Sequence, residues 1–111
     1  MSAVTTHELD TSRGRPAAGI PVVLEQAMDS GWNPVGRGTT DADGRVRDLL
    51  TSAPKAGRYR LTFDTGTYFR AAGDTGFYPE VSVTFVVGEG EEHCHVPLLL
   101  SPFGYSTYRG S

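Results

Sequence analysis

The histidines are the side chains of this sequence best suited to moving protons. His7 lies in the extended-looking stretch Thr-Thr-His-Glu-Leu, and His93 and His95 flank Cys94 near the C-terminus. A neutral imidazole can take a proton from water near neutral pH, and a second imidazole can hold or relay that proton. Catalysis would require these distant residues to meet in the fold. Taken singly, each is more typical of an ordinary surface or interface histidine.

Arg45 is the arginine that we consider first for substrate binding, because it directly follows the tight-turn dipeptide Asp43-Gly44. Its planar guanidinium could hold a substrate carbonyl or a small anion, or it could be a solvated strand residue. The other arginines are scattered and the net charge is −3, which argues against binding to nucleic acid or to a membrane surface. The sequence also lacks the Gly-x-Ser-x-Gly elbow of serine hydrolases and a phosphate-binding glycine loop.

A metal site is the weaker use of the histidine pair. His93 and His95 are two positions apart, so on a strand they would project to the same side and could share a zinc ion. Two histidines without a third nearby ligand are a weak signal, and neither Cys-x-x-Cys nor His-Glu-x-x-His is present. We expect no metal, while leaving open whether His93 binds one.

Short stretches of alternating character predict the strands that must position these residues. Residues 58–64 and 81–87 alternate in the period-2 pattern of half-buried strands, and residues 20–26 are rich in β-branched side chains. Seven or eight such strands, separated by turn signals, predict an all-β antiparallel sandwich. Only Thr67–Gly73 looks helical, with Thr67 as its N-cap and Gly73 at its end.

The C-terminal histidine stretch fits the same alternation. Its inward set is apolar and contains Cys94, Val96, Leu98 and Leu100. The outward set contains His93, His95, Pro97 and Leu99. Because the outward face still carries a leucine and a proline, we expect it to be covered, and another subunit is one candidate.

Length and composition predict a single domain over residues 1–111. The single cysteine excludes an intrachain disulfide and fits a reducing compartment. The N-terminus has neither the basic nor the apolar region of a signal peptide, and no apolar stretch approaches the ~20 residues that span a bilayer. We therefore expect a cytoplasmic protein.

Four stretches of the chain resemble the transthyretin-like 5-hydroxyisourate hydrolases. They are Thr6–Val22, the turn motif Thr40–Val46, the segment Phe77–Val81, and the C-terminal HCHVPLLLSPFGYSTYRGS from His93 to Ser111. In the last stretch, cysteine and phenylalanine stand at positions 94 and 103, where tyrosine is common in the family.

The resemblance implies a sandwich of two four-stranded sheets with one short helix. It also implies a homotetramer, built as a dimer of dimers, with active sites in the channel between dimers. The reaction would be hydrolysis of 5-hydroxyisourate, the product of urate oxidation, to 2-oxo-4-hydroxy-4-carboxy-5-ureidoimidazoline, without a metal or organic cofactor. The alternatives are a non-enzymatic carrier, because transthyretin shares this fold, and an adhesive or sugar-binding sandwich.

Residue by residue, the resemblance assigns catalysis to His7, Arg45 and His95 rather than His93. These three would also bind the substrate, together with the C-terminal residues Tyr108, Arg109, Gly110 and Ser111, which would form a wall of the pocket. The histidines would position and deprotonate water while Arg45 holds the ring carbonyls. Which histidine is the base, and whether Ser111 acts through its hydroxyl or a terminal carboxylate, is left open.

Overall fold

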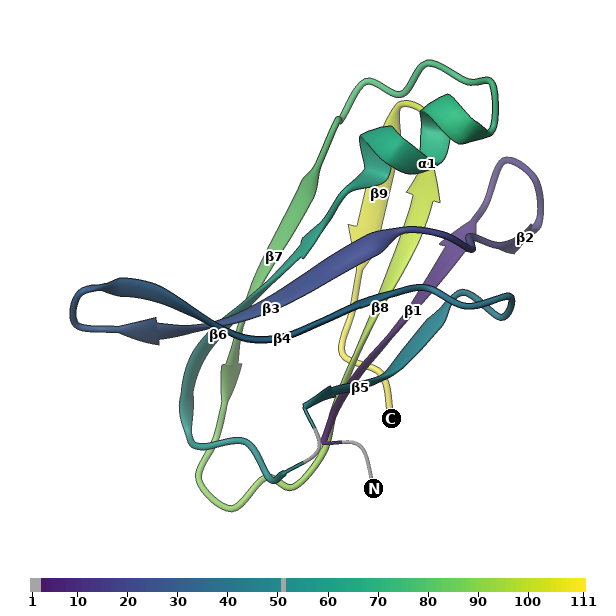
Figure 1. Ribbon diagram of the computed structural model, residues 1–111. Helices are drawn as coiled ribbons and strands as arrows, with labels where there is room; N and C mark the ends of the chain where they lie inside the picture. The colour runs from purple at the N-terminus through teal and green to yellow at the C-terminus, as the bar shows by residue number, and fades with distance from the viewer. Residues whose placement is uncertain (1–2, 51) are drawn as a thin grey trace.

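The computed structural model describes residues 3–50 and 52–111, which form two β-sheets and one helix (Figure 1). The first sheet contains β1 (Val4–Asp10), β2 (Arg15–Pro16), β5 (Arg45–Leu50), β8 (Cys94–Ser101) and β9 (Gly104–Thr107). The second sheet contains β3 (Pro21–Met28), β4 (Gly31–Thr39), β6 (Gly57–Phe63) and β7 (Val81–Val87). Helix α1 (Thr65–Ala71) lies at the end of the sandwich where β1 and β8 finish (Figure 1).

The predicted all-β sandwich is confirmed, with two differences in detail. The second sheet has the order β4-β3-β6-β7 and is antiparallel throughout, as expected. The first sheet has five strands instead of four, because β2 and β5 share one edge of β1. On its other edge β1 pairs with β8 in parallel. Alternation predicts which side chains face inward, but it says nothing about the direction in which two strands pair.

The core lies between the two sheets and follows the predicted alternation. In β6 the side chains of Tyr59, Leu61 and Phe63 are buried, and in β8 the buried set contains all four predicted apolar residues. These residues pack with buried aliphatic side chains of β1 and β3 and with Phe69 of α1 in a single cluster. Burial of this apolar surface is the main force holding the sheets together.

The helix begins two residues before the predicted start. Asp64, not Thr67, is the N-cap: its carboxylate accepts hydrogen bonds from the Thr67 backbone N–H at 3.1 Å and from the Thr67 hydroxyl at 2.7 Å. Gly73 follows the end of the helix with φ +77°, the left-handed conformation that favours glycine. Within residues 3–50 and 52–111, no helix is long and apolar enough to cross a membrane.

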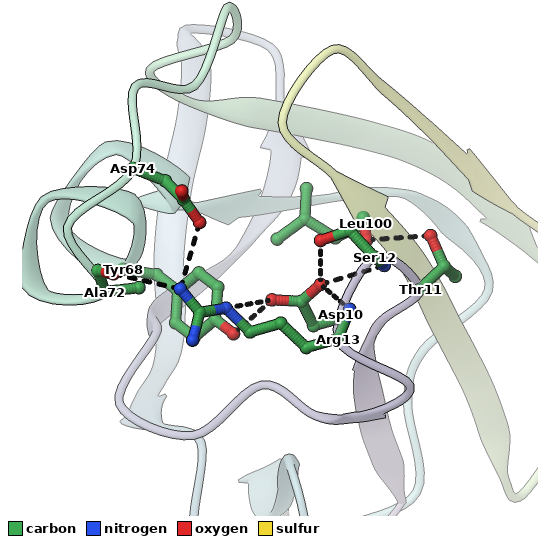
Figure 2. A network of polar contacts seen from close by, with 8 residues as sticks. All are labelled: Asp10, Thr11, Ser12, Arg13, Tyr68, Ala72, Asp74 and Leu100. Atoms are coloured by element: carbon green, nitrogen blue, oxygen red, sulfur yellow. Dashed lines mark hydrogen bonds and ion pairs between the residues drawn. The ribbon is translucent and has the colours of Figure 1, made fainter.

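A polar network joins the end of β1 to α1 (Figure 2). The buried Asp10 carboxylate accepts a 2.5 Å hydrogen bond from the Tyr68 hydroxyl and bonds from the backbone N–H groups of Ser12 and Arg13. Burial alone would raise the pKa of Asp10, but these hydrogen bonds together hold it below its usual value. Arg13 donates in turn to Asp74 at 3.1 Å, so the strand end and the helix end are held together.

Candidate functional site

His7, Arg45 and His95 meet on the outer face of the first sheet. The sheet register pairs His7 with Arg45 of β5 on one side and with Pro97 of β8 on the other. It pairs Thr5 with His95, so the two histidines are diagonal neighbours across the parallel β1–β8 pair. Because side chains alternate along a strand, all of these residues project away from the core. The structure thus brings together three residues that lie far apart in the sequence.

His95 is the most constrained member of this cluster. Its Nδ1 lies 2.8 Å from the Thr5 hydroxyl, which fixes the orientation of the half-buried ring. Burial lowers the pKa of His95 below its usual value of 6.5, and the nearby Arg45, His7 and His93 lower it further. The imidazole is therefore neutral at neutral pH, the form that can accept a proton.

A tight turn over Asp41–Gly44 places Arg45 opposite His7. The Asp41 carboxylate accepts hydrogen bonds from the backbone N–H groups of Asp43 (2.9 Å) and Arg45 (3.0 Å). Gly44 has φ +75°, and a Cβ there would lie 2.4 Å from the carbonyl oxygen of Glu8, so no other residue fits. The predicted turn is present, and the strands before and after it, β4 and β5, belong to different sheets.

The C-terminal residues fold back over β8 next to His95. The Thr107 hydroxyl donates to the Pro97 carbonyl at 2.6 Å, and the Gly110 N–H donates to the His95 carbonyl at 2.9 Å. A Cβ on Gly110 would lie 2.5 Å from Cδ2 of His95, so the backbone there runs directly against the imidazole. Gly110 thus lies against His95, and its part in binding the substrate stays a prediction.

The other residues of the predicted pocket wall, Tyr108, Arg109 and Ser111, are more exposed than Gly110. Arg109 donates to the Glu91 carboxylate at 3.0 Å, and Glu91 also accepts from the Cys94 thiol at 3.3 Å. Tyr108 is 57% exposed, and Ser111 is exposed as well. A cavity of about 250 Å³ lies beside this segment, lined by residues 83–86, 94–96 and 107–109. Neither His7 nor Arg45 lines it, and both side chains are partly exposed.

His93 lies just before β8 and is exposed, and it contributes to the site through its effect on the pKa of His95. Among the residues that the structure describes, no three or more His, Cys, Asp or Glu side chains are grouped so that they could hold a metal ion. Within the described residues, His93 and His95 therefore have no third side chain of these types with which to bind a zinc ion.

Sequence reasoning missed Thr5, which orients His95, and Glu91, which holds Arg109. Thr5 could have been found only from the parallel register of β1 and β8, which the alternation does not contain. It also missed that Glu8 projects into the core, although the alternation around His7 places Thr6 and Glu8 on the opposite face from the histidine.

Comparisons with known proteins show the family and the fold of the chain. A family model described as HIUase/Transthyretin family matches residues 4–110. The chain is 49% identical to the 5-hydroxyisourate hydrolase of Salmonella typhimurium over 109 residues, which cover 97% of this chain and 80% of that protein. The structure of Klebsiella pneumoniae 5-hydroxyisourate hydrolase aligns with a TM-score of 0.87 at 38% identity, covering 99% of this chain and 100% of that one. Transthyretin from Sparus aurata aligns with a TM-score of 0.92 at 34% identity, covering 99% and 97%.

Proposed function

Since this chain belongs to the HIUase/Transthyretin family, we propose that the cluster of His7, Arg45 and His95 is the site at which it hydrolyses 5-hydroxyisourate. The observation that carries this assignment is the meeting of the three side chains on one face, with the His95 imidazole held neutral and oriented by Thr5. A carrier of small ligands would need no group poised to accept a proton, whereas hydrolysis does.

The chemistry requires a water molecule to attack a ring carbonyl carbon while losing a proton. His95 accepts that proton, because its lowered pKa keeps the ring unprotonated, and His7 lies next to it to hold the water. The negative charge that develops on the carbonyl oxygen is stabilised by the Arg45 guanidinium. When the ring C–N bond breaks, the imidazolium returns the proton to the leaving nitrogen, which gives 2-oxo-4-hydroxy-4-carboxy-5-ureidoimidazoline. None of these steps uses a metal or an organic cofactor.

A second copy of the chain is expected to close the site. The outer face of the first sheet carries the half-buried Leu9 and Leu99 beside the histidines, and Tyr108 is largely exposed at its border. We propose a homotetramer, a dimer of dimers with its active sites between the dimers, because exclusion of bulk water would strengthen the polar contacts to the substrate. A cytoplasmic location belongs to the same proposal, since the free Cys94 suits a reducing compartment.

The test is to generate 5-hydroxyisourate in solution from urate with urate oxidase and to follow its ultraviolet decay with micromolar protein. Acceleration of the decay is expected, and kcat/KM should fall as the pH falls through the lowered pKa of His95. Single replacement of His7, Arg45 or His95 by alanine should lower kcat/KM by roughly 10²–10⁴-fold. The matched control is His93→Ala, which should retain most of the activity.

Wild-type protein that binds the compound without accelerating its decay would favour the carrier instead. A variant with near wild-type kcat/KM would remove its residue from the mechanism.

A further inference from the structure

The inner face of the first sheet holds a buried polar pair directly behind the two histidines. Thr6 and Glu8 flank His7 in β1, and Val96 follows His95 in β8. Both polar side chains are fully buried, at 0% exposure. A fully buried glutamate is rare unless it is paired, so its protonation state and partners have consequences for the fold around it.

The hydrogen-bond contacts of Thr6 determine where its proton lies. Its hydroxyl oxygen is 2.6 Å from the Val96 carbonyl oxygen and 2.7 Å from Oε1 of Glu8. A carbonyl oxygen can only accept, and a threonine hydroxyl has a single proton to donate. Once that proton goes to Val96, the contact of Thr6 with Glu8 needs a second proton, which only the Glu8 carboxyl group can supply.

The other carboxyl oxygen supports the same protonation state. Oε2 of Glu8 is buried and has no hydrogen-bond partner among the described residues. An unpaired buried oxygen that shares a full negative charge costs much more free energy than the carbonyl oxygen of a neutral acid. A proton on Oε1 therefore supplies the hydrogen bond to Thr6. The atom left without a partner among the described residues, Oε2, is then the carbonyl oxygen of a neutral acid, which costs less free energy to bury than a charged oxygen.

We propose that Glu8 is a neutral carboxylic acid at neutral pH and acts as a positioning residue for the site. Its O–H donates to Thr6, Thr6 donates to the Val96 carbonyl, and this relay holds β8 against β1 in the register that makes His7 and His95 neighbours. The positioning role rests on the proposed function, whereas the protonation state of Glu8 is independent of it.

The surroundings of Glu8 favour the neutral form. Burial raises its pKa from 4.5 to about 8, and this effect outweighs the lowering by the side-chain contact with Thr6 and by the backbone N–H of Glu8 itself. The titratable side chains facing the same layer from the elements packed around it are Asp10 of β1, Cys94 of β8, Tyr59 of β6 and Tyr68 of α1. None of these is a cation, and the charges of Arg13 and Arg15 act on Tyr68 at the end of β1.

Ionisation of Glu8 should therefore weaken the fold. Its pKa is higher in the folded chain than in the unfolded chain, so the stabilising contribution is complete below about pH 4.5. Between about pH 4.5 and about pH 8, the contribution of Glu8 to the ratio of folded to unfolded protein should fall about tenfold for each pH unit. Above about pH 8, Glu8 is ionised in both the folded and the unfolded chain, so its contribution to the stability of the fold no longer changes with pH.

The protonation state can be measured directly on the assembled wild-type protein. Isotope-edited infrared difference spectra between wild type and Glu8→Gln, with ¹³C-labelled glutamate, should show the signal of a protonated carboxyl group at pH 6.5. That signal should convert to a carboxylate signal near pH 8. A carboxylate signal at pH 6.5 would overturn the proposal, whatever the protein does to 5-hydroxyisourate.

The positioning role is tested by the pH profile of hydrolysis. Glu8→Gln keeps a donor for Thr6 and cannot ionise, so its kcat/KM should decline less above pH 8 than that of wild type. The matched control is Glu25→Gln, which removes a carboxylate bonded to Arg60 in the second sheet, 2.8 Å away, and should keep the wild-type profile. Identical alkaline profiles for Glu8→Gln and wild type would refute the role of Glu8.

A second pair of variants tests the relay where it crosses between strands. Thr6→Val removes the hydroxyl at nearly constant volume and should lower kcat at least tenfold with little change in KM. Thr6→Ser retains the hydroxyl and should restore most of that loss. Equal kcat values for the two variants would show that the hydroxyl does not position the site.

Discussion

In the candidate site, the backbone of Gly110 packs tightly against the ring of His95. The imidazole is held on one side by the Thr5 hydroxyl at Nδ1 and on the other by the C-terminal segment. A general base must keep its orientation relative to the attacked carbonyl, because small misplacements reduce the rate strongly. Contact with Gly110 therefore orients the His95 ring, as the hydrogen bond with Thr5 does.

Gly110→Ala should lower kcat/KM at least tenfold while leaving thermal stability nearly unchanged. The added Cβ would lie 2.5 Å from Cδ2 of His95 and 3.3 Å from Cγ of Pro97, so the ring or the C-terminal segment must move. The control is Gly104→Ala, whose Cβ would meet only the Ser101 hydroxyl oxygen, at an unstrained 3.7 Å. Steady-state kinetics and thermal melts of both variants provide the measurement, and equal kcat/KM values would contradict the packing argument.

At this scale the sequence predicted residue types better than it predicted their partners. The resemblance singled out His7, Arg45 and His95, and the structure places the three on one face. Thr5 could not be predicted, because its contact depends on a register between segments 90 positions apart. The burial of Glu8 was contained in the alternation of β1, but a charged residue is ordinarily expected on the solvent side of a strand.

Among the secondary-structure elements, β1 is the one on which the site depends most. It carries His7 on its outer face and Thr6 and Glu8 on its inner face, and it ends at the Asp10 network with α1. The helix thus anchors β1 at the end farther from the C-terminal segment (Figure 1, Figure 2).

Tyr68→Phe should lower the free energy of unfolding by roughly 1.5–3 kcal/mol, because the buried Asp10 carboxylate loses a hydrogen bond. The pKa of Asp10 is lowered in the folded chain, so the stability that it contributes is present above pH 3.8 and lost as the pH falls through the lowered value. The difference between variant and wild type should shrink in that acidic range. Urea unfolding at several pH values measures it.

The control for this experiment is Tyr105→Phe, which retains the ring contact with Tyr78, whose centroid lies 5.2 Å away. It should unfold within about 0.5 kcal/mol of wild type, as is usual for substitutions outside buried networks. If Tyr68→Phe were no less stable than Tyr105→Phe, the network would not anchor β1.

The elements themselves were predictable where a periodic pattern was long enough. Strands β6, β7 and β8 follow the expected alternation, and Gly73 ends the helix as expected. The start of the helix differed, because Asp64, three residues before the expected cap Thr67, is also a good N-cap residue and its carboxylate takes the role. The two-residue β2 was beyond prediction, since a strand so short has no period to detect.

For the whole molecule, the partly exposed outer face around His7, His95 and Leu99 makes the proposed tetramer testable. Leu99→Asp places a charge on the outer face of β8 and should halve the mass of the assembly, because the charge would be buried between dimers without a partner. The same variant should lose most of its hydrolytic activity. Analytical ultracentrifugation and the decay assay measure both effects.

Arg58→Glu is the matched control, since Arg58 is exposed on the outer face of the second sheet. It should leave both the mass and the activity of the assembly as in wild type. Full activity of Leu99→Asp at half the mass would show that each chain carries a complete site by itself, contrary to the proposed arrangement.

The parallel pairing of β1 with β8 also affects the order in which the strands can pair during translation. In translation, β1 leaves the ribosome about 90 residues before its neighbour β8, and in the interval the strands of the second sheet can already pair with one another. Contacts so distant along the chain close slowly, and until then the edge of β1 that pairs with β8 stays available to other strands. The strand that carries His7 therefore keeps an unpaired edge until β8 has emerged, and His95 can join His7 and Arg45 only after that point.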